Sequence, residues 1–188
     1  MSESARAVLL DRDGTVVVER GYITVPDDVA LVDGAAAGIR ALREQGWKVI
    51  VVSNQASVAK GLITEDELAQ INLRMMALLA GEGATVDGVY CCPHHPEGTV
   101  PEYAVECECR KPRPGLLEQA ARDHDLDLAQ CVMIGDAKRD IEAGRAVGAA
   151  TILVRTGHGE KTVAGPHGAD HVARDLPEAA AWLASRPR

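Results

Sequence analysis

The chain has 188 residues, of which 46% are hydrophobic and 26% are charged, and its formal net charge is −8. This length and balance predict one globular domain over residues 1–188 with a substantial core. The negative charge disfavours broad binding to nucleic acid or to an anionic membrane. No stretch has the roughly 18 consecutive apolar residues of a membrane span, and the first ten residues lack the apolar core of a secretion signal. We therefore expect a cytoplasmic protein without membrane or nucleic-acid partners.

Strand-like and helix-like segments alternate along the chain. Apolar runs at 5–10, 47–52, 131–134 and 151–154 predict strands, with a shorter run ending at residue 91. Segments 34–46, 64–83, 114–125, 138–148 and 175–186 predict helices, the second of which starts with Thr64 as N-cap and Glu67 in capping-box position. This alternation is typical of an α/β fold with a parallel sheet flanked by helices.

Polar side chains follow three of the predicted strands. Asp11 and Asp13 end the first strand, Ser53 ends the second, and Asp136 ends a later one. In parallel α/β sheets ligands bind at the carboxyl ends of the strands, so we expect these groups to converge. Adjacent carboxylates favour a hard divalent ion such as Mg²⁺, for which Asp140, one helical turn beyond Asp136, offers a further oxygen.

Two cations at 110 and 111 suit the same predicted site. Lys111 and Arg110 offer a fixed positive charge and a planar fork for the oxygens of a phosphoryl group, and Ser53 offers a hydroxyl. Each group alone is more often a turn, a helix cap or a surface charge. Their joint occurrence at one sheet edge favours phosphoryl chemistry.

Residues 90–113 hold four of the five cysteines in a stretch without helical or strand periodicity. Cys92 and His94 form one close pair, and Cys107 and Cys109 form another. Three thiolates and one imidazole make a closed tetrahedral Zn²⁺ set, which predicts a structural zinc loop over residues 91–110. Unpaired thiols are the alternative, whereas a disulfide framework is disfavoured by the odd cysteine count and a reducing compartment. We expect Cys91, His95 and Cys131 to lie outside the ligand set.

Four motifs resemble those of the haloacid-dehalogenase-like (HAD) phosphatases. They are "LLDRDGTVV", "VSNQ", "RKPRPG" and "GDAKRD", in that order. The resemblance implies a Rossmann-like fold in which Asp11 attacks phosphorus and Asp13 protonates the leaving oxygen and later activates water. It further implies that Ser53 and Lys111 stabilise the phosphoryl oxygens. Mg²⁺ would be held by Asp11, by the main-chain carbonyl of Asp13 and by Asp136.

The zinc loop narrows this resemblance. "CPHHPEG" followed by "CECRKPRPG" resembles the D-glycero-D-manno-heptose 1,7-bisphosphate 7-phosphatase branch, which implies a compact enzyme without a large cap domain. We expect this enzyme to be a monomer. The implied substrate is a small sugar bisphosphate that loses its 7-phosphate. The substrate-binding residues that the resemblance implies are Glu19, Arg20, Gly21, Tyr22, Ser53, Asn54, Gln55, Arg110 and Lys111.

The chain departs from this pattern at two places. Ala56, Ser57 and Val58 stand where the family often has Ser-Gly-Ile, and Ala137 stands where a Lys is common. The second departure removes a cation expected near the substrate, which leaves the sugar and its anomer open. The sequence leaves three alternatives to a heptose bisphosphate phosphatase. They are a histidinol-phosphate phosphatase, a catalytically silent zinc-loop interaction module, and a nucleic-acid end phosphatase. The net charge and the 3% aromatic content disfavour the last of these.

Overall fold

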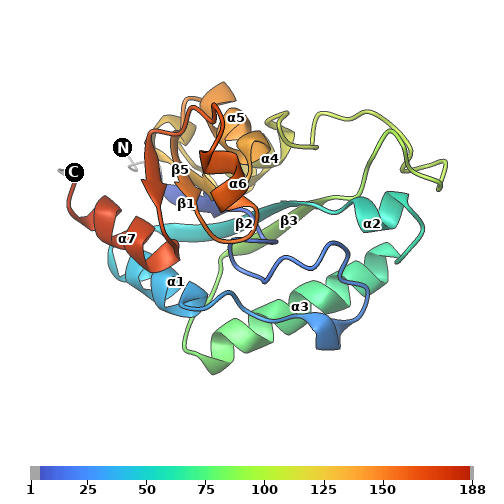
Figure 1. Cartoon of the computed structure of the whole chain (residues 1–188), viewed down its shortest axis with the longest axis horizontal. Coiled ribbons are helices and arrows are strands. Elements are labelled where there is room, and N and C mark those ends of the chain that lie inside the picture. The colour runs from blue at the N-terminus through green and yellow to red at the C-terminus, as the bar shows by residue number, and fades with distance from the viewer. Residues whose placement is uncertain (1–4, 187–188) are drawn as a thin grey trace.

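The computed structural model describes residues 5–186, whose central feature is a sheet of six parallel strands in the order β3-β2-β1-β4-β5-β6 (Figure 1). The strands are β1 (Ala7–Leu10), β2 (Lys48–Asn54), β3 (Gly88–Cys92), β4 (Val132–Gly135), β5 (Ala150–Val154) and β6 (His171–Ala173). Because β1 lies between β2 and β4, the segments that leave these three strands emerge side by side at one edge of the sheet.

Helices cover both faces of the sheet (Figure 1). One face packs against α1 (Ala35–Glu44), α3 (Glu65–Gly81) and α7 (Leu176–Ala184), and the other against α4 (Gly115–His124) and α5 (Lys138–Ala146). Strand β1 is buried on both sides: Val8 and Leu10 belong to the first core, and Ala7 and Leu9 to the second. Such two-sided burial explains why the strand reads as a continuous apolar run.

The structure confirms the α/β class and every segment predicted as a strand or helix. Thr64 and Glu67 form the expected capping box, since the Glu67 amide donates to the Thr64 hydroxyl at 3.2 Å and the Thr64 amide donates to the Glu67 carboxylate at 2.7 Å. Three short elements were not predicted: α2 (Ala56–Ala59), α6 (Gly159–Val163) and β6. Segments of three to five residues are too short to show a hydrophobic period.

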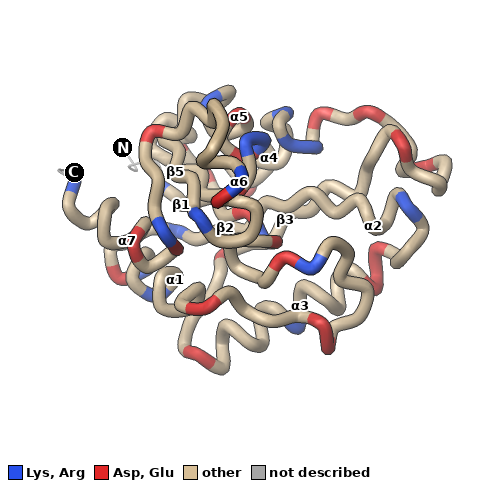
Figure 2. The backbone as a smooth tube through the Cα atoms, viewed as in Figure 1, with Lys and Arg blue, Asp and Glu red and all other residues tan. Residues whose placement is uncertain are grey.

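The carboxyl edge of the sheet carries the long irregular segments. Residues 93–113, between β3 and α4, project beyond α2 and return toward the sheet (Figure 1). The remaining connections include two 3₁₀ turns, Pro26–Asp28 and Leu128–Gln130. Among residues 5–186, no helix has the length and apolar character needed to cross a membrane. Acidic and basic residues are interspersed along the chain in the view of Figure 2. The charges that matter for a site are therefore those of individual neighbouring residues.

Candidate active site

Three buried carboxylates meet at the carboxyl edge of the sheet. Asp11 follows β1, Asp136 follows β4, and Asp140 lies in the first turn of α5. Each contributes an oxygen to a cluster whose members lie within 4.8 Å of one another. Gly14 is required beside them, because its φ is +84° and a Cβ there would overlap the Asp136 carboxylate.

Lys111 lies under this cluster and is almost completely buried. Its Nζ donates to Asp11 Oδ1 at 2.9 Å and to the carbonyl of Val52 at 2.7 Å, and it forms an ion pair of 2.7 Å with Asp140 Oδ1. Burial alone would lower the pKa of Lys111, but Asp11 and Asp140 outweigh it and raise the pKa. Lys111 is therefore a fixed cation beside Asp11.

One carboxylate oxygen of Asp136 is buried without a hydrogen-bond partner among residues 5–186. Its Oδ2 accepts a hydrogen bond of 2.7 Å from the amide of His158, whereas its Oδ1 is buried without a partner among the described residues. Burial, with the charge of Asp11, raises the pKa of Asp136 to about 7. A buried oxygen without a donor beside a second carboxylate fits a hard divalent cation, which would supply the missing partner and offset the repulsion.

Asp13 points away from the cluster toward a buried arginine. Arg12 Nη2 lies 3.0 Å from Asp13 Oδ2, Arg12 Nε donates to Asp13 Oδ1 at 3.1 Å, and Gln55 Nε2 donates to Asp13 Oδ2 at 2.6 Å. Burial raises the pKa of Asp13; Arg12 opposes the rise and Asp11 adds to it. Arg12 itself is held by Asn72 of α3, whose Oδ1 accepts from Nη1 at 2.9 Å.

A cavity of about 310 Å³ opens above these groups. Its lining includes six of the predicted substrate-binding residues: Glu19, Gly21, Tyr22, Asn54, Gln55 and Arg110. Ser53 and Lys111 are buried beneath it, and Arg20 is exposed outside the lining. A larger cavity of about 400 Å³ contains Trp47 and Trp182 but lies at the opposite edge of the sheet, away from the carboxylates.

Three groups at this cavity were not expected from the sequence: Arg139 and His158 line it, and Arg12 lies beneath Asp13. Ala56 and His95 also line it, although the sequence pointed to no role for either in the cavity. Arg139 stands next to Asp140 and three residues after Asp136 in "GDAKRD". Its place between two site residues was the signal in the sequence that it lies near the site.

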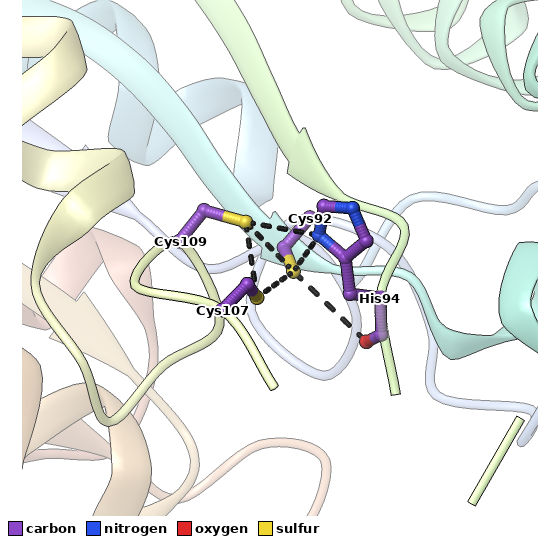
Figure 3. Close-up of side chains that lie close together, drawn as sticks. All are labelled: Cys92, His94, Cys107 and Cys109. Carbon is purple, nitrogen blue, oxygen red and sulfur yellow. Dashed lines mark hydrogen bonds between the residues drawn. The ribbon is translucent and has the colours of Figure 1, made fainter. Parts of the chain in front are cut away.

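The four predicted zinc ligands converge (Figure 3). Cys92 ends β3 and His94 follows it, while Cys107 and Cys109 come from the returning part of the loop. The Sγ atoms are 3.5 Å apart for Cys92 and Cys107, 3.1 Å for Cys92 and Cys109, and 3.3 Å for Cys107 and Cys109. His94 Nδ1 lies 3.3 Å from Cys109 Sγ and 3.7 Å from Cys92 Sγ.

These separations, 3.1–3.7 Å, are compatible with a closed metal site. Ligands about 2.0–2.3 Å from a tetrahedral Zn²⁺ lie about 3.5–3.8 Å apart, so the four side chains are at or slightly inside that spacing. A disulfide, by contrast, needs roughly 2.05 Å. Burial raises the pKa of the Cys92 and Cys109 thiols, so these thiolates need a cation to be stable. Cys91 and Cys131 lie outside the cluster, as expected.

The cluster adjoins the two cations at 110 and 111. Arg110 Nη1 donates to the carbonyl of His94 at 3.0 Å. Asn54, at the end of β2, donates from Nδ2 to the carbonyl of Lys111 at 2.9 Å and accepts from its amide at 3.0 Å. The loop is thus tied to the sheet at the residue that contacts Asp11.

Comparisons with known proteins agree with this geometry. Residues 108–179 match the family model described as HAD-hydrolase-like. The chain is 42% identical over 183 residues to the D-glycero-beta-D-manno-heptose-1,7-bisphosphate 7-phosphatase of Yersinia pestis, covering 95% of this chain and 97% of that one. It is 41% identical to the protein of that name from Escherichia coli strain K12 over 159 residues, covering 84% and 83% of the two chains.

A solved structure is similar over nearly the whole chain. It is the D,D-heptose 1,7-bisphosphate phosphatase from B. bronchiseptica complexed with magnesium and phosphate, with a TM-score of 0.85 and 35% identity over 95% of this chain and 98% of that chain. Both the sequence relatives and this structure are phosphatases of one kind. The chain therefore belongs to the HAD-like phosphatases, in the family of the heptose 1,7-bisphosphate 7-phosphatases.

Proposed function

We propose that the protein removes the 7-phosphate of D-glycero-D-manno-heptose 1,7-bisphosphate, with Asp11 as nucleophile. The observation that carries the proposal is the position of the Asp11 carboxylate, which lies at the floor of a cavity beside the buried cation Lys111, 2.9 Å away. The substrate is suggested by the names of relatives about 40% identical over most of the chain. We further propose that the enzyme is cytoplasmic and monomeric.

In this proposal the reaction begins with attack of an Asp11 oxygen on phosphorus, which forms an aspartyl-phosphate and releases the sugar. Covalent catalysis divides one difficult displacement into two easier ones. Lys111 stabilises the charge on the phosphoryl oxygens, with the buried hydroxyl of Ser53 beside them. Gln55 Nε2 donates to Ser53 Oγ at 2.8 Å and thereby orients it.

Asp13 serves as general acid and then as general base. It lines the cavity two residues after the nucleophile, and burial keeps its pKa above the usual value, which favours the protonated form needed for the first step. Arg12 and Gln55 fix the orientation of its carboxyl group. After the sugar leaves, the same group accepts a proton from the water that hydrolyses the aspartyl-phosphate.

The two metal sites have different donors and different roles. Asp11 and Asp136, with the main-chain carbonyl of Asp13, would hold Mg²⁺, which when bound supplies positive charge beside the transferring phosphoryl group. Cys92, His94, Cys107 and Cys109 would hold Zn²⁺ with no open position, which suits a structural role. We propose that this zinc site holds the loop in one conformation and thereby fixes Arg110 and Lys111 at the cavity.

A substrate panel tests the proposal. Phosphate release is measured with Mg²⁺ for both anomers of heptose 1,7-bisphosphate, histidinol phosphate and fructose 1,6-bisphosphate, with Asp11→Asn as the inactive control. We expect kcat/KM to be highest for one heptose anomer. A preference for histidinol phosphate would replace the substrate assignment, and absence of turnover with any phosphoester would support a catalytically silent module.

A further inference from the structure

The segment that follows β5 forms three hydrogen bonds to the strand ends that carry the proposed Mg²⁺ ligands. The amide of His158 donates to Asp136 Oδ2 at 2.7 Å, and the hydroxyl of Thr162 donates to the main-chain carbonyl of Asp136 at 2.9 Å. The hydroxyl of Thr156 donates to the main-chain carbonyl of Gly14 at 2.6 Å. One short segment therefore contacts both the end of β4 and the turn that follows Asp11.

Close packing of main chains brings this segment, residues 156–162, against the carboxylates. Gly157 has a φ of +56°, and a Cβ at this position would overlap both the Asp136 carboxylate and the main chain of Gly14. Only glycine fits such a position without strain. The approach of the two main chains allows short side chains such as threonine to reach the carbonyls on the other side.

The segment holds Asp136 at two atoms and leaves a third for a cation. The His158 amide occupies Oδ2, and the Thr162 hydroxyl occupies the main-chain carbonyl. Oδ1 is buried and has no hydrogen-bond partner in the part of the chain that the structure describes. Partners of this kind orient metal ligands, and their loss commonly weakens metal binding.

Thr156 acts at the main-chain ligand. The carbonyl of Asp13, which we assign to Mg²⁺, belongs to the peptide that joins Asp13 to Gly14. The amide of Gly14 donates to the carbonyl of Val17 at 2.7 Å, and the carbonyl of Gly14 accepts from Thr156. Glycine is conformationally permissive, so the two bonds restrict the direction in which the preceding carbonyl points.

A purely structural role for these hydroxyls would be local bonding within the segment. The Thr162 hydroxyl lies 3.2 Å from the carbonyl of His158, four residues earlier, which is an ordinary contact for a threonine in a helix. The carbonyl of Asp136 is closer, at 2.9 Å, and is 26 residues away in the chain. Because a hydroxyl has one proton, the shorter bond to the end of β4 is favoured.

We propose that Thr156 and Thr162 are positioning residues for Mg²⁺, which hold the carbonyl of Asp13 and the carboxylate of Asp136 in the orientation that the ion requires. Each threonine acts through a main-chain carbonyl and not on the ion itself. Mg²⁺ demands near-ideal octahedral geometry, so small displacements of a ligand lower its affinity. The inference rests on the Mg²⁺ site of the proposed function, but not on which sugar is hydrolysed.

The test measures Mg²⁺ affinity by titration calorimetry at pH 8 in the absence of substrate. Thr156→Val and Thr162→Val each remove one hydroxyl and nearly preserve the shape of the side chain. We expect each to weaken Mg²⁺ binding roughly 3- to 10-fold, and the double variant roughly 10- to 100-fold. Thr162→Ser keeps the hydroxyl and should bind Mg²⁺ within about twofold of the wild type.

Thr151→Val is the matched control for a loss of stability. The hydroxyl of Thr151 is buried near the start of β5, at the opposite end of the strand from the carboxylates, and donates to Asp170 Oδ2 at 2.8 Å. Its removal should lower Tm but change Mg²⁺ affinity less than about twofold. All variants are checked for folding by circular dichroism, and the alanine variant replaces a valine variant that does not fold.

Two results would overturn the positioning role alone. One is wild-type Mg²⁺ affinity in both folded single variants, and the other is an equal weakening by Thr151→Val, since the effect would then follow stability and not ligand orientation. If the wild type binds no Mg²⁺, the metal site of the proposed function is itself wrong.

Discussion

Lys111 and Asp140 form an ion pair of 2.7 Å although both side chains are completely excluded from solvent. The pair joins the loop that follows the cysteine cluster to the first turn of α5. Asp140 also caps that turn through the amide of Ala137, and Lys111 also contacts Asp11. One buried pair therefore links the helix, the loop and the proposed nucleophile.

Asp140→Asn should destabilise the protein strongly. It leaves Lys111 buried with only Asp11 as a counter-charge, and breaking a buried pair by removing one partner costs about 3–5 kcal/mol. We expect this loss in the free energy of unfolding measured by urea denaturation. Glu142→Gln removes the partner of Lys138 in the exposed pair on the same helix and should cost less than about 0.5 kcal/mol. Equal losses in the free energy of unfolding would show that the buried pair stabilises the protein no more than the exposed pair does.

Arg110→Ala and Lys111→Ala should separate substrate recognition from catalysis. Arg110 lines the cavity wall, so its loss should raise KM for the sugar bisphosphate and change turnover of p-nitrophenyl phosphate little. Lys111 contacts Asp11, so its loss should lower kcat for both substrates by about 100-fold or more. Steady-state kinetics on both substrates decides this. A similar loss on both from Arg110→Ala would place Arg110 at the reacting phosphate instead.

Protein purified without added metal should contain one tightly bound Zn²⁺ per chain, because thiolates select a softer ion than carboxylates do. Elemental analysis measures it. Cys107→Ser combined with Cys109→Ser should abolish the zinc, whereas Cys91→Ala, next to the cluster in β3, should retain it. Zinc-free protein supplied with Mg²⁺ should lose activity on the bisphosphate because Arg110 and Lys111 are no longer fixed. Full activity in that state would remove the positioning role of the loop.

Mg²⁺ binding should depend on pH through Asp136, whose pKa is raised to about 7 mainly by burial. A carboxyl group with a raised pKa favours the folded state while it is protonated, and this contribution is lost as pH rises through about 7. Mg²⁺ competes with the same proton. We expect the apparent Mg²⁺ affinity, measured by titration calorimetry, to be about tenfold higher at pH 8 than at pH 6. We also expect Mg²⁺ to raise Tm more at pH 8, and equal effects at both values would contradict the assignment.

Much of the site could be predicted because strand order alone brings its parts together. Asp11 and Asp136 follow β1 and β4, which are neighbours in the sheet, so a parallel arrangement places them side by side. The cluster of three cysteines and one histidine could be predicted because two close pairs of soft donors stand in a loop without periodicity. The capping box of α3 was identifiable because it depends only on local spacing.

The rest depends on tertiary packing that a linear pattern does not show. In an extended segment Arg12 would point away from Asp13, but its side chain folds back onto that carboxylate and contacts Asn72 of α3. Asp140 lies in the carboxylate cluster with Asp11 and Asp136, but its ion pair with Lys111 from a distant loop had no signal in the sequence. The position of Arg139 in the cavity lining depends on where α5 begins, which the sequence pattern fixes only approximately.

The central claim, attack by Asp11, is tested most directly by trapping the phosphoryl group. In Asp13→Asn the carboxyl group that activates water is lost, but p-nitrophenyl phosphate has a leaving group that needs no proton. With Mg²⁺ we expect a burst of about one p-nitrophenolate per chain, followed by very slow turnover, and mass spectrometry should find one phosphoryl group on Asp11. A folded Asp13→Asn protein that turns over p-nitrophenyl phosphate without a burst, or that carries the phosphoryl group elsewhere, would contradict the account.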